Sequence, residues 1–189
     1  MKKIIATTNA PKASNVYSQA IHAGNMLFVS GQLPIDVNTG EMPDTFLEQV
    51  QQVLKNLKAV VEAAQFSLTE VVKVNIFLTD FYDFELKENY ERVYKPIFGE
   101  YQDPIGDDEE IDCACDEDLE DVDDFIGEED DEFDEDYFDE EECFIDNFAV
   151  LNTIYPEYFP ENPPARSCIA VKQLPKGALI EIECIAMKA

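Results

Sequence analysis

One stretch of the chain is too acidic to form a compact unit by itself. Between Tyr101 and Pro160 the sequence contains 27 Asp or Glu residues and no Lys or Arg. Like charges at that density repel one another and oppose a packed core. The rest of the 189-residue chain is nearly neutral, because it holds all 13 basic residues and the remaining 15 of the 42 acidic ones. The sequence therefore predicts a folded body and a separate acidic region.

Hydrophobic periodicity predicts the first half of the body. Two β-prone runs, residues 17–23 and 26–29, are joined by a Gly-Asn pair and predict a hairpin. Apolar residues then recur at helical spacing over residues 44–64, and Thr45 with Glu48 has the spacing of a capping box. A long amphipathic helix is expected there.

Two more elements are expected before the acidic region. Ser67 and Glu70 repeat the capping-box spacing for a single turn. The apolar run at residues 71–78 then predicts a strand with both faces covered, or nearly so. A second helix is expected from about residue 83 to residue 98.

Two strands are expected after the acidic region, at residues 165–171 and 178–187. A Leu-Pro-Lys-Gly sequence separates them, and the pair is interpreted as a second hairpin. The order β-β-α-β-α-β-β predicts an α+β domain with a mixed sheet whose helices cover one face. The uncovered face of so small a domain favours a homo-oligomer.

Arg166 stands at the head of the first of these strands, directly after Pro163-Pro164-Ala165. A guanidinium held by such a rigid entry is suited to bidentate capture of a carboxylate. From spacing alone, a surface or interface salt bridge is the favoured alternative. Cys168 lies on the same strand face as Arg166 and is expected to be an inert, partly buried thiol, because the single histidine of the chain is far away in sequence.

Glu181 and Glu183 alternate with apolar residues along the last expected strand and share one of its faces. The simple interpretation is a half-solvated strand. The functional alternative is that one glutamate is desolvated in an oligomer interface, where its basicity acts on a water molecule. The pattern alone favours the simple interpretation.

Five motifs together carry a family resemblance. In chain order they are Tyr17-Ser18-Gln19-Ala20, Val29-Ser30-Gly31-Gln32-Leu33-Pro34, Pro164-Ala165-Arg166-Ser167-Cys168, Leu174-Pro175-Lys176-Gly177 and Ile180-Glu181-Ile182-Glu183. They resemble the signature of the reactive-imine deaminase family, the RidA or YjgF type. The resemblance implies a homotrimer of chorismate-mutase-like subunits with a ligand cleft at each subunit interface. It also implies hydrolysis of 2-imino acids, such as 2-iminobutanoate and 2-iminopropanoate, to 2-keto acids and ammonia.

The resemblance further implies residue roles. Arg166 would bind the substrate carboxylate, Glu181 would orient and activate the attacking water, and Tyr17 would wall the cleft. The other residues expected to line the cleft are Ser30, Gly31 and Cys168. A protonated imine is already electrophilic and chiefly needs positioning and a delivered water, so no metal or organic cofactor is expected.

The chain departs from the family pattern in two places. The family usually has Gly-Pro before the tyrosine of the first motif, whereas Asn15 and Val16 stand there in this chain. The family also commonly carries an Asn on its second helix, for which Glu88 and Asn89 are the candidates.

The expected hairpin also separates the two proposed catalytic residues. If Gln173 pairs with Ala178, Glu181 lies roughly 13 Å from Arg166. A different strand register, a water molecule or a neighbouring subunit must then bridge the gap.

Comparison with the family also sets the expected domain limits. Joining residues 98–101 directly to residues 159–162 would give an ordinary family member, so residues 102–158 are interpreted as inserted. Residues 1–101 and 159–189 would form the deaminase-like domain. Apolar residues interrupt the acidic runs of the insertion, which suggests a segment that is disordered or loosely helical alone and can dock on a basic protein or a cation. Simple solvated disorder is the equally weighted alternative.

The acidic region contains no strong ligand motif. No EF-hand loop fits its glycines, and the Cys113-Ala114-Cys115 sequence with distant Cys143 lacks a fourth soft ligand. Nucleic acid is not expected as a partner, because phosphates repel so acidic a surface.

A cytoplasmic location is expected. The N-terminal residues lack the apolar run of a secretory signal, and no window approaches a membrane span. Five cysteines are an odd number, which favours free thiols in a reducing compartment.

Two functions compete at this point. The first is the imine deaminase, which intact Arg166 and Glu181 favour. The second is a non-catalytic trimeric scaffold that displays acidic arms to basic proteins or cations, which the altered residues at 15 and 16 favour.

Overall fold

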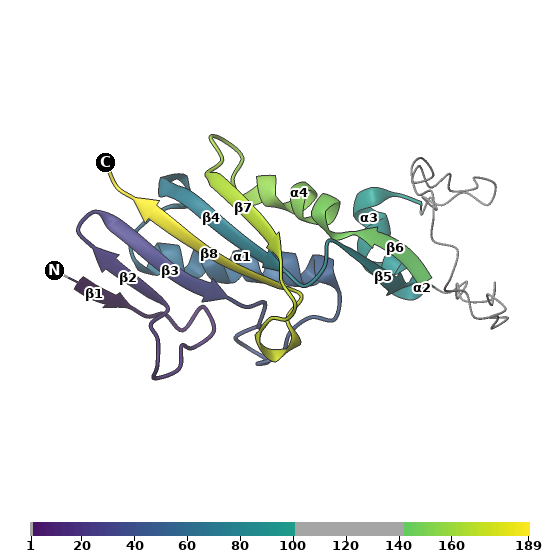
Figure 1. Ribbon diagram of the computed structural model, residues 1–189, viewed down its shortest axis with the longest axis horizontal. Helices are drawn as coiled ribbons and strands as arrows, with labels where there is room; N and C mark the ends of the chain where they lie inside the picture. Colours follow the sequence, from purple (N-terminus) through teal and green to yellow (C-terminus); the bar gives the residue numbers. More distant parts are fainter. Residues whose placement is uncertain (1, 101–141) are drawn as a thin grey trace, which may run out of the picture.

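The computed structural model describes residues 2–100 and 142–189 of the chain. Its centre is a six-stranded sheet with the order β1-β2-β3-β8-β4-β7 (Figure 1). Strands β4 and β7 run parallel and the other neighbours are antiparallel, so the sheet is mixed. The strands are β1 (Lys2–Ile5), β2 (Ala20–Ala23), β3 (Met26–Gln32), β4 (Val71–Leu78), β7 (Ala165–Ala170) and β8 (Ile180–Met187).

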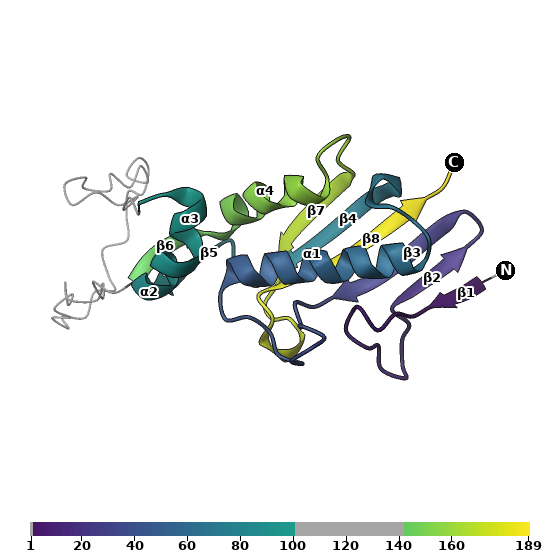
Figure 2. The same cartoon turned by 180° about the vertical axis from the view of Figure 1, so that it is seen from behind.

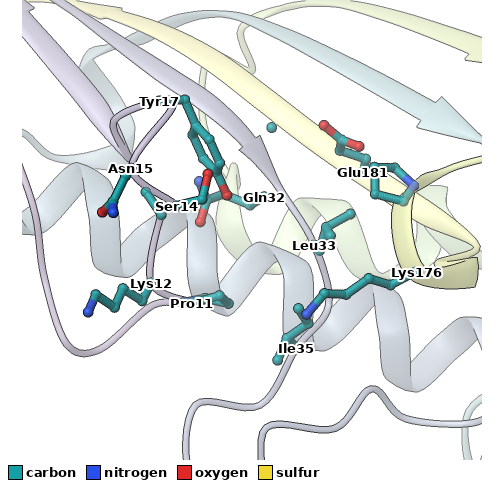
Figure 3. A pocket seen from close by; sticks show the side chains of 13 residues that line it. Pro11, Lys12, Ser14, Asn15, Tyr17, Gln32, Leu33, Ile35, Lys176 and Glu181 are labelled. Carbon is teal, nitrogen blue, oxygen red and sulfur yellow. The ribbon is translucent and has the colours of Figure 1, made fainter.

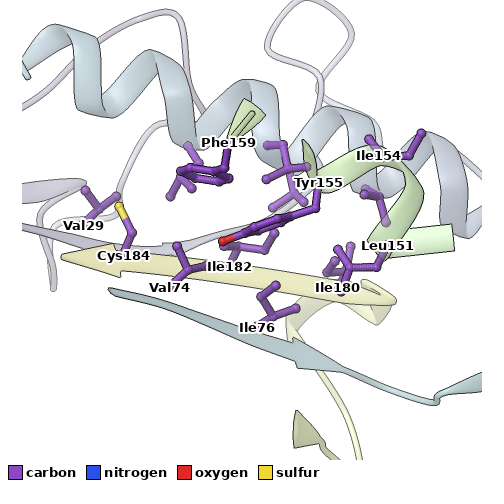
Figure 4. Close-up of a cluster of buried hydrophobic side chains, with 14 of the residues drawn as sticks. Val29, Val74, Ile76, Leu151, Ile154, Tyr155, Phe159, Ile180, Ile182 and Cys184 are labelled. Atoms are coloured by element: carbon purple, nitrogen blue, oxygen red, sulfur yellow. The ribbon is translucent and has the colours of Figure 1, made fainter. Parts of the chain in front are cut away.

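Two helices, α1 (Phe46–Ala63) and α4 (Asn147–Tyr158), lie side by side on one face of this sheet (Figure 2). Helix α1 begins where expected, because the Thr45 side chain accepts a hydrogen bond from the Glu48 N–H at 3.3 Å. Figure 4 shows how side chains of α4 pack onto β4 and β8 to form the core beneath that helix. The expected α+β fold with a mixed sheet and helices on one face is confirmed.

A second, two-stranded sheet joins β5 (Tyr82–Leu86) to β6 (Glu142–Asp146) in antiparallel register. A helical run follows β5, formed by α2 (Lys87–Asn89), the π-helical turn η2 (Tyr90–Tyr94) and α3 (Lys95–Phe98). Residues 82–100 and 142–146 are called the arm below, and the rest of the described chain is called the body. The arm extends beyond one end of the main sheet (Figure 1).

Two hydrogen bonds donated by Asn147 close the base of the arm. The Asn147 N–H donates to the Phe81 carbonyl at 2.9 Å, and the Asn147 side-chain amide donates to the Asp80 carbonyl at 3.3 Å. The chain therefore leaves the body after Phe81 and returns at the same point.

The second helix expected from residue 83 begins later than predicted. Residues 82–86 form β5, and the helical run starts at Lys87. The partner of β5 is β6, which lies far away in sequence, so no local pattern could indicate the pairing.

The expected second hairpin is wrong. Strand β4 lies between β7 and β8, so these two strands are not paired with each other. The short connection between them, with the 3₁₀ turn η3 (Pro175–Gly177), thus crosses β4 instead of closing a hairpin. Strand β4 was expected to be covered on both faces, or nearly so, but it is covered on one. Its Lys73, Asn75 and Phe77 are only half-buried, and they lie on the same uncovered face as the glutamates of β8.

The C-terminal limit expected for the insertion, residue 158, is also wrong. Residues 147–158 form α4, and its Leu151, Ile154 and Tyr155 are buried in the core of the body. The helix belongs to the body because its apolar residues recur at helical spacing and pack on the sheet. Residues 102–141, with the Cys113-Ala114-Cys115 sequence, lie outside the described residues.

Two kinds of structural feature are absent from the described residues. None of their helices is long and apolar enough to cross a membrane. The same part of the chain contains no group of three or more His, Cys, Asp or Glu side chains that could hold a metal ion.

Candidate active site

A cavity of about 740 Å³ opens beside β8, at the end of the hairpin formed by β2 and β3. Figure 3 shows Tyr17 and Glu181 facing this cavity from its two sides, with Lys176 at its rim. Gly31 and Leu33 line its floor. Three of the residues expected at the site, Tyr17, Gly31 and Glu181, are thus brought together.

The Glu181 carboxylate packs directly against Gly31. A Cβ atom at residue 31 would clash with Glu181 Oε1 and would lie 2.7 Å from Cδ. The register of β3 against β8 is irregular between Val29 and Gln32, which places Gly31 in the bulge next to Glu181. Only glycine therefore lets this carboxylate rest against the backbone of β3.

Burial raises the pKa of Glu181 above its ordinary value, and the neighbouring Glu183 carboxylate raises it further. Glu183 itself accepts a hydrogen bond from the Asn75 side chain at 2.8 Å. Both carboxylates lie on the sheet face that the helices leave uncovered, as the alternation predicts. The raised pKa makes Glu181 a better proton acceptor near neutral pH than an ordinary glutamate.

Tyr17 and Ser30 differ in their surroundings. Tyr17 is 52% exposed and borders the cavity, and Asn15 lines the wall beside it. Ser30 is held by backbone groups instead, because its hydroxyl donates to the Ser18 carbonyl at 2.7 Å and its N–H donates to the Gln19 carbonyl at 3.0 Å. Ser30 fixes the strand that carries Gly31.

Arg166 lies away from this cavity, at the edge strand β7. Its Nη2 donates a hydrogen bond to Asn152 Oδ1 at 2.8 Å, and its guanidinium carbon lies 4.9 Å from the ring centroid of Tyr155. Cys168, two residues along the same strand face, is a half-buried thiol whose pKa is raised by burial and lowered by the Arg166 charge. These residues come from β7 and α4.

Strand register explains why Arg166 and Glu181 do not meet. Val74 of β4 stands opposite Arg166 on one side and Cys184 on the other, whereas Phe77 stands between Ile169 and Glu181. The two backbone positions are three residues apart along the strands and two strands apart across the sheet, which is roughly 14 Å. Val74 is buried beneath the helices and Phe77 is not, so Arg166 and Glu181 also lie on opposite faces.

Sequence reasoning missed Asn152, the residue that bonds Arg166. The candidates for the helix Asn were Glu88 and Asn89, but Asn89 donates to Glu85 in the arm. A signal existed, because Asn152 follows buried Val150 and Leu151 at helical spacing just before the Arg166 motif. It was overlooked because residues 147–158 were assigned to the acidic insertion.

Comparison with known proteins assigns the family. The family model described as endoribonuclease L-PSP matches residues 7–106 and 144–188. A RutC family protein of Pyrococcus horikoshii is 35% identical over 189 residues, which cover 100% of this chain and 99% of that protein. The Escherichia coli protein called 2-iminobutanoate/2-iminopropanoate deaminase is 30% identical over 191 residues, with 100% and 99% covered.

Solved structures agree with this assignment. A crystal structure of a Thermotoga maritima protein, described as a putative endoribonuclease, is 35% identical with a TM-score of 0.63 and covers 100% of this chain and 99% of that one. Escherichia coli TdcF with bound serine is 27% identical with a TM-score of 0.62, and 99% of each chain is covered. The chain is a member of the endoribonuclease L-PSP family, the RidA or YjgF group of proteins.

Proposed function

We propose that this protein hydrolyses 2-imino acids, such as 2-iminobutanoate and 2-iminopropanoate, to 2-keto acids and ammonia. The observation that carries the proposal is the position of Glu181. Its carboxylate rests against Gly31 at the wall of a cavity, and burial raises its pKa. The name of the Escherichia coli relative supports the same reaction class.

In the proposed reaction, Arg166 binds the substrate carboxylate and Glu181 takes a proton from a water molecule. The water oxygen bonds to the carbon of the protonated imine, and the C=N electron pair moves to nitrogen. Glu181 then gives its proton to that nitrogen, the C–N bond breaks, and ammonia leaves. The hydroxyl proton passes through Glu181 to solvent as the keto group forms. Tyr17 walls the cavity, and Gly31 holds the carboxylate in place, with Ser30 and Cys168 as flanking residues.

The site is completed by a second copy of the chain, in a homotrimer. Arg166 and Glu181 lie on opposite faces of one sheet, so a single chain does not bring both to one small substrate. The uncovered face also exposes Phe28 and Ile169, by 42% and 52%, and association between copies would bury this apolar surface.

A subunit-mixing experiment tests both parts of the proposal. Arg166→Ala and Glu181→Gln proteins should each fail to form keto acid from imines generated in situ from alanine or 2-aminobutanoate. Refolded together in equal amounts, they should regain activity, because some interfaces then pair an intact Glu181 with an intact Arg166. In random trimers about one quarter of the interfaces are intact.

Three results would contradict the proposal. Imine hydrolysis by the Arg166→Ala protein at the wild-type rate would show that Arg166 does not bind the substrate. A mixture as inactive as its components would place both residues in one subunit. An inactive wild-type protein that retains its trimer would favour the acidic scaffold that binds a basic protein or a cation.

The same proposal excludes RNA as the substrate, although the family description names an endoribonuclease. A formal net charge of -29 repels a polyphosphate chain. Incubation with single-stranded RNA should therefore give no cleavage. We place the reaction in the cytoplasm, where the thiols of Cys168 and Cys184, free in the structure, would stay reduced.

A further inference from the structure

Three side chains of one helix surround the Arg166 guanidinium. Besides the hydrogen bond to Asn152, its carbon lies 4.9 Å from the ring centroid of Tyr155 and 5.5 Å from that of Phe148. Both distances are within the range of a cation–π interaction. Residues 148, 152 and 155 are four and three positions apart, so they form one stripe along α4.

Each ring is itself held in place. Tyr155 is only 6% exposed, and its ring contacts Phe159 at a centroid distance of 4.6 Å inside the core (Figure 4). Phe148 is 37% exposed, but its ring meets the edge of Phe81 at 5.9 Å and 77°. Phe81 is the last residue of the body before the arm, and the hydrogen bond from Asn147 fixes it.

This arrangement has a consequence for binding. An arginine side chain has many rotamers, and ordering it on binding a ligand costs free energy. Two fixed rings and one hydrogen bond restrict the guanidinium beforehand. Asn152 uses one of its five N–H donors, which leaves a donor pair for bidentate binding of a carboxylate.

We propose that Phe148 and Tyr155 are positioning residues that hold the Arg166 guanidinium in the orientation in which it binds the substrate carboxylate. The inference rests on the proposed function for the identity of the ligand. Asn152 sets the in-plane rotation of the guanidinium, and the two rings set its tilt. The body supports this arrangement through Phe81, its last residue before the arm.

Phe148→Leu is the sharpest test, because the residue is partly exposed and the variant should fold. The affinity for 2-ketobutanoate, a stable carboxylate of the product class, is measured by titration calorimetry. Phe148→Leu should weaken binding about fivefold and raise KM for the imine by a similar factor with kcat unchanged. Phe98→Leu is the matched control: Phe98 is 40% exposed but contacts Tyr94 in the arm, and its loss should change neither value.

A double-mutant cycle shows whether the ring acts through Arg166. In the Arg166→Ala protein, where residual keto acid binding is weak, Phe148→Leu should have no further effect. The inference is overturned if Phe148→Leu binds normally, if Phe98→Leu weakens binding equally, or if the Phe148 effect persists without Arg166.

The experiment separates failure of the inference from failure of the proposed function. A wild-type protein that binds 2-ketobutanoate through Arg166 and Phe148 but hydrolyses no imine would refute the reaction and support the positioning role. A protein that hydrolyses imines but is indifferent to Phe148→Leu would refute the positioning role alone. A wild-type protein that does not bind the keto acid would overturn the positioning role.

Discussion

The body and the arm are stabilised in different ways. The body packs two amphipathic helices on a six-stranded sheet, and its core includes fully buried Leu54, Leu57 and Ile182. The arm has a two-stranded ladder that contacts α4 and a short helical run that contacts α1. Two strands alone bury too little apolar surface to be stable independently. The arm therefore depends on the body, and it adds Tyr90, Tyr94, Cys143 and Ile145 to the body's core cluster.

Polar contacts join the helical run of the arm to the start of α1. The Leu47 N–H donates to the Tyr94 hydroxyl at 3.4 Å, and Arg92 forms an ion pair with Glu48 at 2.7 Å. Exposed ion pairs of this kind contribute little to stability. The hydroxyl and ring of Tyr94, buried at the start of α1, therefore link the helical run to the body more strongly than this ion pair does.

The largest expected difference is in folding, between two deletions that differ in whether they remove α4. Removing residues 102–158, the limits that the sequence suggested, takes away α4 and its buried Leu151 and Ile154, and the protein should not fold. Replacing residues 101–141 by a Gly/Ser linker of about ten residues should preserve the fold, since such a linker spans up to roughly 33 Å and closure cost changes slowly with length. Circular dichroism and light scattering measure both outcomes. An unfolded linker variant would make residues 101–141 part of the core.

The next largest expected difference is in turnover, between a glycine substitution in the body and one in the arm. Gly31→Ala places a methyl group where the Glu181 carboxylate lies, so turnover should fall roughly 100-fold while the fold persists. Gly99→Ala in the arm meets no neighbouring atom but strains a residue at φ +85°, so it should cost about 1 kcal/mol and leave turnover unchanged. Equal turnover in the two variants would show that Gly31 does not position Glu181.

Sequence alone predicted those parts of the molecule whose signals are local. The cap at Thr45, the long helix after it, the first hairpin and the two faces of β8 follow from spacing within a few residues. The pairing of β5 with β6, and the insertion of β4 between β7 and β8, depend on contacts between distant segments. The acidic composition also led to a wrong limit for the insertion. Its end was placed at residue 158 from charge alone, although residues 147–158 have a helical pattern and form α4. Asn152 was lost with it.

Half-buried Glu181 and buried Glu85 provide a matched pair of intermediate effect. Burial raises the pKa of Glu181 in the body and of Glu85 in the arm above 4.5, with smaller increases from nearby carboxylates, while Asn89 partly offsets the rise at Glu85. A raised folded-state pKa means that the folded state holds the proton more tightly than the unfolded state. Stability from this source is present at low pH and is lost as pH rises from the ordinary value through the raised one.

Glu181→Gln and Glu85→Gln should therefore both melt higher than the wild type at pH 7, by roughly 1–3 °C, and the gain should shrink at pH 4. Turnover separates the two regions, since only Glu181→Gln should lose most of it. Thermal melts at the two pH values and a keto acid assay give both quantities. A stabilised Glu181→Gln protein with full turnover would show that Glu181 is an ordinary strand residue with no part in the reaction.

Two buried tyrosines, one in each region, should affect stability with opposite signs. Burial raises the pKa of Tyr155 in the body to about 12 and also raises that of Tyr94 in the arm. The Tyr155 hydroxyl has no hydrogen-bond partner among the described residues, whereas the Tyr94 hydroxyl accepts from the Leu47 N–H. An unpartnered buried hydroxyl costs free energy, and a partnered one contributes to stability.

Tyr155→Phe should consequently stabilise the protein and Tyr94→Phe should destabilise it, each by about 1 kcal/mol. Urea unfolding at neutral pH resolves a difference of that size when both variants keep the wild-type m-value. Neither substitution should change turnover, because Tyr155→Phe retains the ring beside Arg166 and Tyr94 lies in the arm. Destabilisation by both variants would mean that the Tyr155 hydroxyl contributes to stability as the Tyr94 hydroxyl does, and the contrast drawn between body and arm would fail at this position.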